Sequence, residues 1–231
     1  MSGALPEKLV VALDGPSGVG KSTVAKLIAE ALEVPYLDTG AMYRCVGLHA
    51  LRTGRDSKPT QAEVRTMLEE IDLALKVRDG EPVLMFDGAP VGDEIRTVEV
   101  ARVTSMLAAE PEVREWLVEL QRRFAAHHGG VLEGRDIGTV VVPDTPHKFF
   151  LTADSAVRAE RRWSEMDPEQ RPPLEEVEAE IVARDERDQS RQASPLLRTP
   201  EHLLVDTSHH DARAVARRIV AFVQGSQVGT R

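Results

Sequence analysis

The residues best suited to chemistry form a glycine-rich segment near the start of the sequence. Gly15-x-x-x-x-Gly20-Lys21-Ser22 matches in full the pattern of a phosphate-binding P-loop. Its glycines let the backbone turn tightly, so that the N–H groups point inward at phosphate oxygens. Lys21 is expected to reach the β- and γ-phosphates, and the Ser22 hydroxyl to ligate Mg²⁺. The segment predicts a triphosphate site made of Gly15, Pro16, Ser17, Gly18, Val19, Gly20, Lys21, Ser22 and Thr23.

The residues on either side of this motif predict the elements that hold it. Leu9 to Leu13 is a short apolar run typical of a buried strand, and from Ser22 to Leu32 apolar residues recur at helical spacing. A strand, a glycine-rich turn and a helix in this order predict an α/β fold, with the three-layer core and parallel sheet of P-loop nucleotide-binding proteins. Further strands are expected at Val131-Leu132, at His147 to Leu151 with a helix from about Asp154, and at Leu203 to Val205 with a helix over Ala212 to Val223.

The pattern changes between about residues 54 and 111. One helical stripe is followed by short strand-like runs that are separated by Asp79-Gly80 and Asp87-Gly88. Asp-Gly between apolar runs is a strong hairpin signal. We therefore predict a small antiparallel sheet in an inserted lobe at about residues 54–111, which could close over a substrate. The stripe consists of Val64, Met67, Leu68 and Ile71, and the strand-like runs are residues 73–77, 83–86 and 89–91.

A second polar segment begins near the end of the helix that follows residue 154. Residues 164–173 contain Asp167-Pro168 and Pro172-Pro173, and these prolines exclude a continuous helix. Helical spacing resumes between Leu174 and about Arg187. We predict a short mobile lid at about residues 160–192, with residues 1–231 forming a single domain that carries both the lobe and the lid.

Composition limits the classes of partner and the compartment. The formal net charge of −9 argues against binding nucleic acid through phosphate neutralisation. No stretch approaches the roughly 18 apolar residues that a membrane span needs, and residues 1–8 do not have the features of a signal peptide. Cys45, the only cysteine, is expected to be a small buried side chain, and a chain with one cysteine suits a reducing cytoplasm. We expect a cytoplasmic protein with small-molecule partners, neither nucleic acid nor membrane.

The P-loop does not by itself name the reaction, because motors, GTPases, transporters and small-molecule kinases all contain one. The acidic pair of hydrolytic motors does not follow the apolar strands, and the Asn-Lys-x-Asp pattern of GTPases is absent from the sequence. Transfer of a phosphoryl group to a second anion requires several cations to converge on one cleft, and guanidinium groups bind phosphate bidentately. The candidates stand at predicted loop or helix edges; they are Arg44, Arg114, Arg135, Arg184 and Arg191. Taken singly, each could instead be a solvated surface residue.

Several segments in order resemble the bacterial cytidylate kinases, a branch of the nucleoside monophosphate kinases, from Val10 to about Val223. They are Asp14-Gly-Pro-Ser-Gly-Val-Gly-Lys-Ser-Thr23, Leu37-Asp-Thr-Gly-Ala-Met-Tyr-Arg44, Glu94-Ile-Arg-Thr-Val-Glu-Val100, Glu133-Gly-Arg-Asp-Ile-Gly-Thr-Val140 and Arg184-Asp-Glu-Arg-Asp-Gln-Ser-Arg191. The resemblance implies a single P-loop kinase domain that phosphorylates CMP, and dCMP, with ATP and Mg²⁺ in pyrimidine nucleotide metabolism. The design, with its mobile lobe, suits a monomer.

The resemblance also implies roles for individual residues. Lys21, Arg135 and Arg191 would serve catalysis, Ser22 would ligate the metal, and Arg158 and Arg162 would approach ATP from the lid. Ser105, Arg114 and Asp136 would contact the base, because a carboxylate beside an arginine complements cytosine. Arg184 and Asp188 would meet the ribose hydroxyls. The complete predicted CMP site is Thr39, Arg44, Ser105, Arg114, Arg135, Asp136, Arg184, Asp188 and Arg191.

Several of these residues have alternative interpretations. Ser105 could be a solvated helix serine, and Asp136 could cap a strand end or serve in the outer shell of Mg²⁺. The Arg184, Asp188 and Arg191 series would also fit a surface ion-pair ladder. Thr39, where the family usually has serine, is expected to cap the helix that begins there.

Two other functions fit the P-loop less well. A kinase for shikimate or another small molecule is disfavoured by the hairpin-rich insert and by Gly134-Arg135-Asp136. A nucleotide-responsive binding module without catalysis is disfavoured because Lys21, Ser22 and the set of arginines are all present.

Overall fold

The apolar run beside the P-loop forms β1 (Val10–Asp14), the middle strand of a parallel five-stranded sheet in the computed structural model, which describes residues 8–78, 81–169, 171–191 and 193–228. The strand order is β2-β6-β1-β7-β8, so consecutive strands are joined by crossovers as the α/β prediction requires. The other strands are β2 (Tyr36–Asp38), β6 (Gly130–Gly134), β7 (His147–Thr152) and β8 (Leu203–Asp206).

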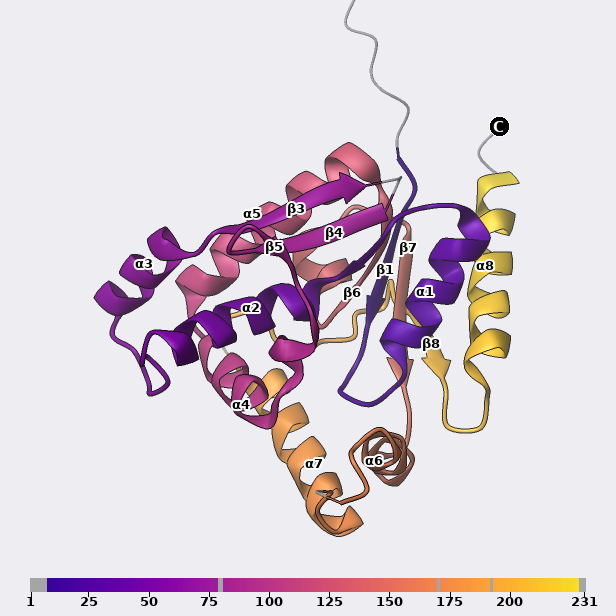
Figure 1. The fold of residues 1–231 in the computed structure, drawn as a ribbon. Coiled ribbons are helices and arrows are strands. Elements are labelled where there is room, and N and C mark those ends of the chain that lie inside the picture. Colours follow the sequence, from indigo (N-terminus) through magenta and orange to yellow (C-terminus); the bar gives the residue numbers. More distant parts are fainter. Residues whose placement is uncertain (1–7, 79–80, 170, 192, 229–231) are drawn as a thin grey trace, which may run out of the picture.

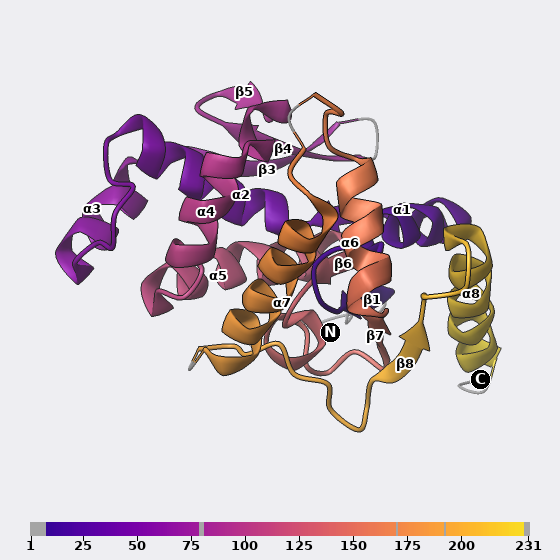
Figure 2. The ribbon, with the colours of Figure 1, turned by 90° about the horizontal axis from the view of Figure 1, so that it is seen from below.

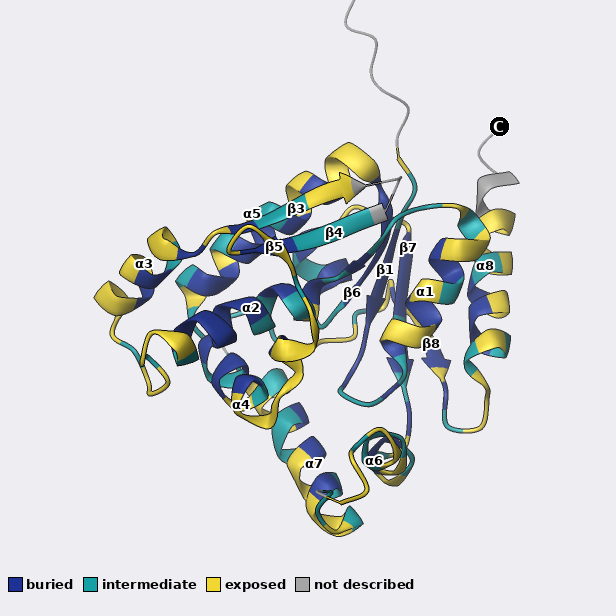
Figure 3. Cartoon of the chain, viewed as in Figure 1, coloured by how far each residue is buried: buried dark blue, intermediate teal, exposed yellow. Residues whose placement is uncertain are grey.

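Helices cover both faces of this sheet, which confirms the three-layer prediction (Figure 1). One face packs against α1 (Lys21–Leu32) and α8 (Ala212–Val228), which lie side by side, and the other against α2 (Thr39–Arg52) and α5 (Pro111–His128). Alternation along β1 explains the two layers, because Val11 and Leu13 enter one hydrophobic cluster while Ala12 enters the other. The central strands are mostly buried, and exposed residues lie on the outer faces of the helices (Figure 3).

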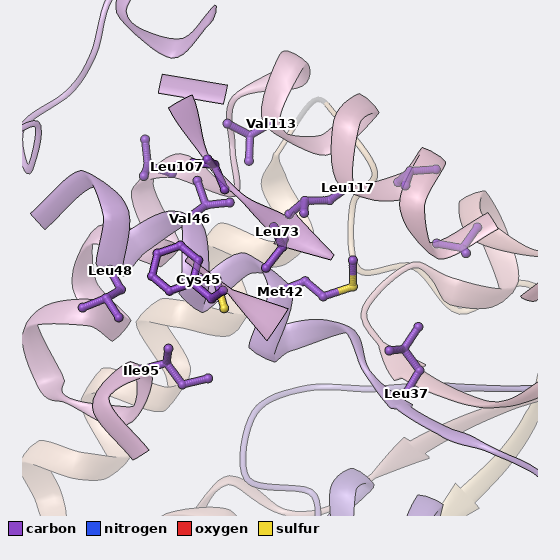
Figure 4. Packing of buried hydrophobic residues seen from close by; sticks show 14 of the residues in the cluster. Leu37, Met42, Cys45, Val46, Leu48, Leu73, Ile95, Leu107, Val113 and Leu117 are labelled. Atoms are coloured by element: carbon purple, nitrogen blue, oxygen red, sulfur yellow. The ribbon is translucent and has the colours of Figure 1, made fainter. Parts of the chain in front are cut away.

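The segment expected to form the inserted lobe contains the predicted small antiparallel sheet. It contains α3 (Gln61–Glu70), the antiparallel strands β3 (Leu73–Arg78), β4 (Glu81–Phe86) and β5 (Ala89–Pro90), a short 3₁₀ helix (Asp93–Arg96) and α4 (Val98–Leu107). The turn at Asp87-Gly88 has left-handed backbone at both residues, whereas the predicted turn at Asp79-Gly80 lies outside the described residues. Leu73 of β3 joins Met42 and Cys45 of α2 in the same core cluster (Figure 4).

One glycine sets the distance between the lobe and the core. A Cβ atom added at Gly47 of α2 would lie 2.3 Å from Thr104 Oγ1 and 3.1 Å from the backbone nitrogen of Thr104. The missing side chain therefore lets α4 approach α2 closely. Because Ser105 follows Thr104, this contact also determines how far Ser105 stands from the core.

The predicted lid at about residues 160–192 covers the end of one helix and the whole of the next, and these two helices pack on each other. These are α6 (Ser155–Ser164) and α7 (Leu174–Ser190), which meet through Ala159, Val177 and Ile181. Between them, the described residues 165–169 and 171–173 are not helical, as the prolines predict. Both helices lie beyond the carboxyl ends of β1 and β7, and they run beside each other when seen from below (Figures 1 and 2).

Two further sequence predictions concern Cys45 and membrane segments. Cys45 is fully buried, and burial raises the pKa of its thiol to about 12, which confirms it as a small core side chain. No helix in the described part of the chain combines the length and apolar character needed to cross a membrane.

Candidate active site

A cavity of about 560 Å³ opens at the carboxyl ends of the central strands. This is the edge at which ligands bind in open parallel α/β sheets. At one end it is lined by the P-loop, and at the other by residues from α2, α4 and α5. Between them lie residues that follow β6 and side chains from α6 and α7. The predicted residues that line it are Ser17–Thr23, Thr39, Arg44, Ser105, Arg114, Arg135, Asp136, Arg162, Arg184, Asp188 and Arg191.

The P-loop has the strained backbone that its glycines permit. Gly18 and Gly20 have φ values of 74° and 87°, a left-handed conformation that disfavours other residues. The Lys21 ammonium donates to the carbonyl oxygens of Gly15 at 2.9 Å and Pro16 at 2.7 Å. Burial, together with the nearby Arg135 charge, lowers the pKa of Lys21 to about 7. A bound polyphosphate would supply the negative charge that this buried amine lacks.

Arg158 supports the P-loop from behind. Its guanidinium donates to the carbonyl oxygens of Ser17 at 3.1 Å and Ala153 at 3.0 Å, and it forms a buried ion pair with Asp185 of α7. The same Asp185 accepts a hydrogen bond of 3.3 Å from the Ser17 backbone. Arg158, which was predicted to approach ATP, is not among the residues that line the cavity. Its guanidinium is instead paired with Asp185 inside the protein.

Arg161, which the sequence analysis did not identify, lines the cavity in its place. It donates to the Thr207 carbonyl at 2.6 Å and to the Thr207 hydroxyl at 3.1 Å, which fixes it beside the P-loop. The pair Arg161-Arg162 was visible in the sequence, but only the orientation of α6 shows that both line the cavity while Arg158 packs inward.

The other end of the cavity holds a buried ion pair between Arg114 of α5 and Asp136. Both residues are nearly inaccessible, with 3% and 5% of their surface exposed. Arg114 also donates to the Ala108 carbonyl at 3.1 Å, while its Nε has no partner among the described residues. Asp136 precedes a single π-helical turn (Ile137–Val141), yet its side chain forms no capping hydrogen bond within the described chain. The carboxylate and arginine predicted to read a base are thus adjacent.

A cluster of cations lies between the two ends. Asp188 accepts from Arg135 Nε at 2.9 Å and from Arg191 Nη1 at 3.5 Å. Burial, and then the charge of Arg135, lowers the pKa of Arg184 to about 10. Arg44 also lines this region, and burial lowers the pKa of its guanidinium. Three of these arginines, Arg135, Arg184 and Arg191, surround the single carboxylate of Asp188, and the excess of positive charge favours a bound anion.

The predicted helix cap is wrong by one residue. Asp38, not Thr39, occupies the cap of α2, and its carboxylate accepts from the Ala41 backbone at 3.0 Å. Because the helix begins at Thr39, the acidic residue before it takes the capping position. The Thr39 hydroxyl instead donates to the Glu133 carbonyl at 2.6 Å, which joins the start of α2 to the end of β6.

Glu133 is the principal carboxylate that the sequence analysis missed. It is 4% exposed, accepts from the Tyr36 hydroxyl at 2.6 Å, and burial raises the pKa of its carboxyl group. Its position at the end of a predicted strand, directly before Gly134-Arg135-Asp136, was the available signal. Ser22 lies close enough to share a hydrogen bond with it. A hydroxyl beside a carboxylate is a suitable oxygen environment for Mg²⁺.

Comparison with known proteins extends over nearly the whole chain. The family model described as "Cytidylate kinase" matches residues 11–225. A cytidylate kinase from Fervidobacterium nodosum is 42% identical over 93% of this chain and 95% of its own length. One from Desulfitobacterium hafniense is 43% identical over 94% of this chain and 93% of its own length. A solved structure of an uncharacterized protein from Eubacterium ventriosum, at 11% identity, covers 94% of this chain and 99% of that chain with a TM-score of 0.51, a likeness of fold alone.

Proposed function

This chain belongs to the cytidylate kinase family, and on that premise we propose that it transfers the γ-phosphoryl group of ATP to CMP, and also to dCMP. The observation that carries the proposal is the arrangement of the cavity. A triphosphate cradle forms one end, and the buried Arg114–Asp136 pair forms the other, with the arginine cluster between them. Such a site can hold two nucleotides with their phosphates facing each other.

At the donor end, the P-loop amides and Lys21 would hold the ATP phosphates. Arg161 lies beside the P-loop carbonyl of Val19, and Arg162 follows it in α6 and lines the same cavity, so we place both on the ATP side. Ser22, beside Glu133, would hold the Mg²⁺ that arrives with ATP. When bound, Mg²⁺ neutralises charge on the transferred phosphoryl group.

At the acceptor end, the exocyclic amine of cytosine would donate to the Asp136 carboxylate, and Arg114 would donate to the ring acceptors. Ser105 lines this end as well. Arg184 and Asp188 would meet the ribose, while Arg44, Arg135 and Arg191 would hold the CMP phosphate. Arg191 Nη2 is buried without a partner among the described residues, so it has a donor to offer.

In the reaction, an oxygen of the CMP phosphate attacks the γ-phosphorus in line, and the bond to the β–γ bridging oxygen breaks to release ADP. The nucleophile is already an anion, so no general base is required. Lys21, Arg135 and Arg191 would stabilise the charge on the phosphoryl group during transfer. Closure of the lobe at about residues 54–111 and the lid at about residues 160–192 would exclude water, which would otherwise hydrolyse ATP. We propose that the single kinase domain acts as a cytoplasmic monomer.

A coupled assay of ADP release, with CMP, dCMP, UMP, AMP and GMP as separate acceptors, tests this proposal. CMP and dCMP should lead the other acceptors by about a hundredfold or more in kcat/KM, because a site built to bind a polar group discriminates against ligands that lack it. ADP release that needs no added monophosphate would contradict a kinase. Equal use of UMP and CMP would contradict Asp136 as the reader of the amine.

Binding of ATP should take up protons in mildly alkaline solution. In the free protein the pKa of Lys21 is about 7, so the amine is mostly neutral at pH 8.5. The triphosphate favours the charged amine and raises this pKa, so the protein gains up to about one proton on binding between pH 7 and the bound pKa. Titration calorimetry in buffers of different ionisation enthalpy measures this number. A heat of binding that does not change with the buffer would refute this proton uptake. In the Lys21→Met variant, which lacks the amine, the contribution of residue 21 to the buffer dependence of the binding heat should be absent.

A further inference from the structure

A buried carboxylate outside the cavity links the two halves of the site. Asp14, the last residue of β1, is fully buried and does not line the cavity. Its carboxylate accepts hydrogen bonds of 2.8 Å from the backbone nitrogens of both Ile137 and Gly138. A buried charge is tolerated only when its hydrogen bonds are satisfied, so these contacts hold Asp14 in one orientation.

These partners are the first residues of the π-helical turn that follows Asp136. The N–H groups at the start of a helical turn have no partner within the turn, and the side chain just before it usually accepts from them. Asp136 occupies that position but forms no such bond within the described chain; its carboxylate pairs with Arg114 instead. Asp14 therefore performs, from a neighbouring strand, the capping that Asp136 would otherwise perform.

His202 completes this corner. Its Nε2 lies 3.3 Å from Asp14 Oδ2, and its Nδ1 lies 3.2 Å from the Thr199 backbone nitrogen. A backbone N–H can only donate, so Nδ1 is the acceptor and Nε2 carries the hydrogen that faces Asp14. A Cβ atom added at Gly138 would lie 2.7 Å from the same Nε2, which shows how closely the residues fit.

Because of its position, Asp14 connects the two nucleotide-binding ends of the cavity as well as capping the π-helical turn. It immediately precedes Gly15 of the P-loop, and in the sheet it stands opposite Gly134 of β6. One side chain thus joins the start of the donor loop to the residue that follows Asp136. Displacements of about 1 Å in such a site lower rates by about a hundredfold.

We propose that Asp14, supported by His202, is a positioning residue that frees Asp136 from helix capping, so that Asp136 faces the acceptor base. This inference rests on the proposed function, because it assumes that Asp136 reads the cytosine amine. Without the Asp14 carboxylate, the Asp136 side chain can rotate toward the unpaired N–H groups of Ile137 and Gly138. Discrimination between cytosine and uracil would then weaken.

The test compares kcat/KM for CMP and UMP in four forms of the full chain: wild type, Asp14→Asn, Asp136→Asn and the double variant. The ratio for the two acceptors cancels any effect on ATP binding, which both reactions share. Asp14→Asn should lower the CMP:UMP ratio by about tenfold, the size of one charge-assisted hydrogen bond. In the Asp136→Asn background it should have no further effect on the ratio, because Asp14 acts through Asp136.

Thr145→Val is the matched control. Thr145 donates to the carbonyl of Val10 at 2.6 Å, at the opposite end of β1, so its loss destabilises the same strand away from the site. It should lower the melting temperature and leave the ratio within twofold of wild type. A ratio that Asp14→Asn leaves unchanged, or lowers equally in the Asp136→Asn background, would overturn the inference.

Two further comparisons distinguish failure of the proposed base reader, Asp136, from failure of the inference about Asp14. If Asp136→Asn itself leaves the ratio unchanged, the proposed base reader is wrong and the inference fails with it. If Asp136→Asn changes the ratio but Asp14→Asn does not, the inference alone fails. If Asp14→Asn does not fold, His202→Leu takes its place as the test variant. His202→Gln is then the conservative control. The leucine should lower the ratio by about threefold and the glutamine should restore it; an unchanged ratio in the leucine variant would overturn the inference.

Discussion

The Lys21→Ala variant should lose about a thousandfold in kcat for CMP phosphorylation while it keeps its fold. Removal of one preorganised donor at a developing charge costs about 10² to 10³ in rate. Lys21 is a buried lysine in the phosphate cradle, and within the described part of the chain its hydrogen-bond acceptors are the two carbonyl oxygens of Gly15 and Pro16. Stopped-time assays of CDP formation measure the loss, and circular dichroism checks the fold.

The stability of this variant separates a functional lysine from a structural one. Burial disfavours the charged form of Lys21 in the ligand-free protein, so its removal should not lower the melting temperature. The thermal stabilisation that ATP gives the wild type should largely disappear. Lys26→Ala, on the exposed side of the same helix, is the control and should keep normal kcat. A Lys21→Ala enzyme within tenfold of wild type would remove Lys21 from the mechanism.

The layers of the fold could be predicted because each depends on local patterns. Apolar runs of two to five residues predicted most of the strands, and the Asp87-Gly88 turn predicted part of the inserted hairpin sheet. The cap of α2 was misplaced because Asp38 and Thr39 are both good capping residues in adjacent positions. Only the residue at which the helix begins, Thr39 in the structure, shows that Asp38 is the cap.

The arginines show which features of the site could be predicted from the sequence and which could not. Arg44, Arg114, Arg135, Arg184 and Arg191 all line the cavity, as their convergence predicted. Arg158 and Arg161 lie on different faces of α6, and the spacing of residues did not distinguish the arginine that lines the cavity from the one that supports the P-loop through Ser17 and Asp185. Glu133 and Asp14 were missed because their roles depend on contacts with residues nearly 100 or more positions away, such as Tyr36 and Ile137.

The Arg114→Met variant should be the most severe change at the acceptor end, because it affects both stability and turnover. It leaves Asp136 buried without its cationic partner, and breaking a buried pair on one side costs about 3–5 kcal/mol. Chemical denaturation measures this loss. Arg65→Met breaks an exposed pair with Glu112, in which the arginine side chain is 68% exposed, and should cost no more than about 1 kcal/mol.

The double variant Arg114→Met, Asp136→Leu then separates the two effects. Replacing a whole buried ion pair by apolar side chains of similar volume is often neutral, so most of the lost stability should return. CMP turnover should not return, because the carboxylate that would accept from the cytosine amine is gone, and kcat/KM should stay at least about a hundredfold below wild type. A double variant that recovers both stability and CMP turnover would show that the pair only supports the fold. Recovery of stability without CMP turnover would show that the charges of Arg114 and Asp136 recognise the base. The protein would then keep these charges buried, and so shielded from water, until a nucleotide binds.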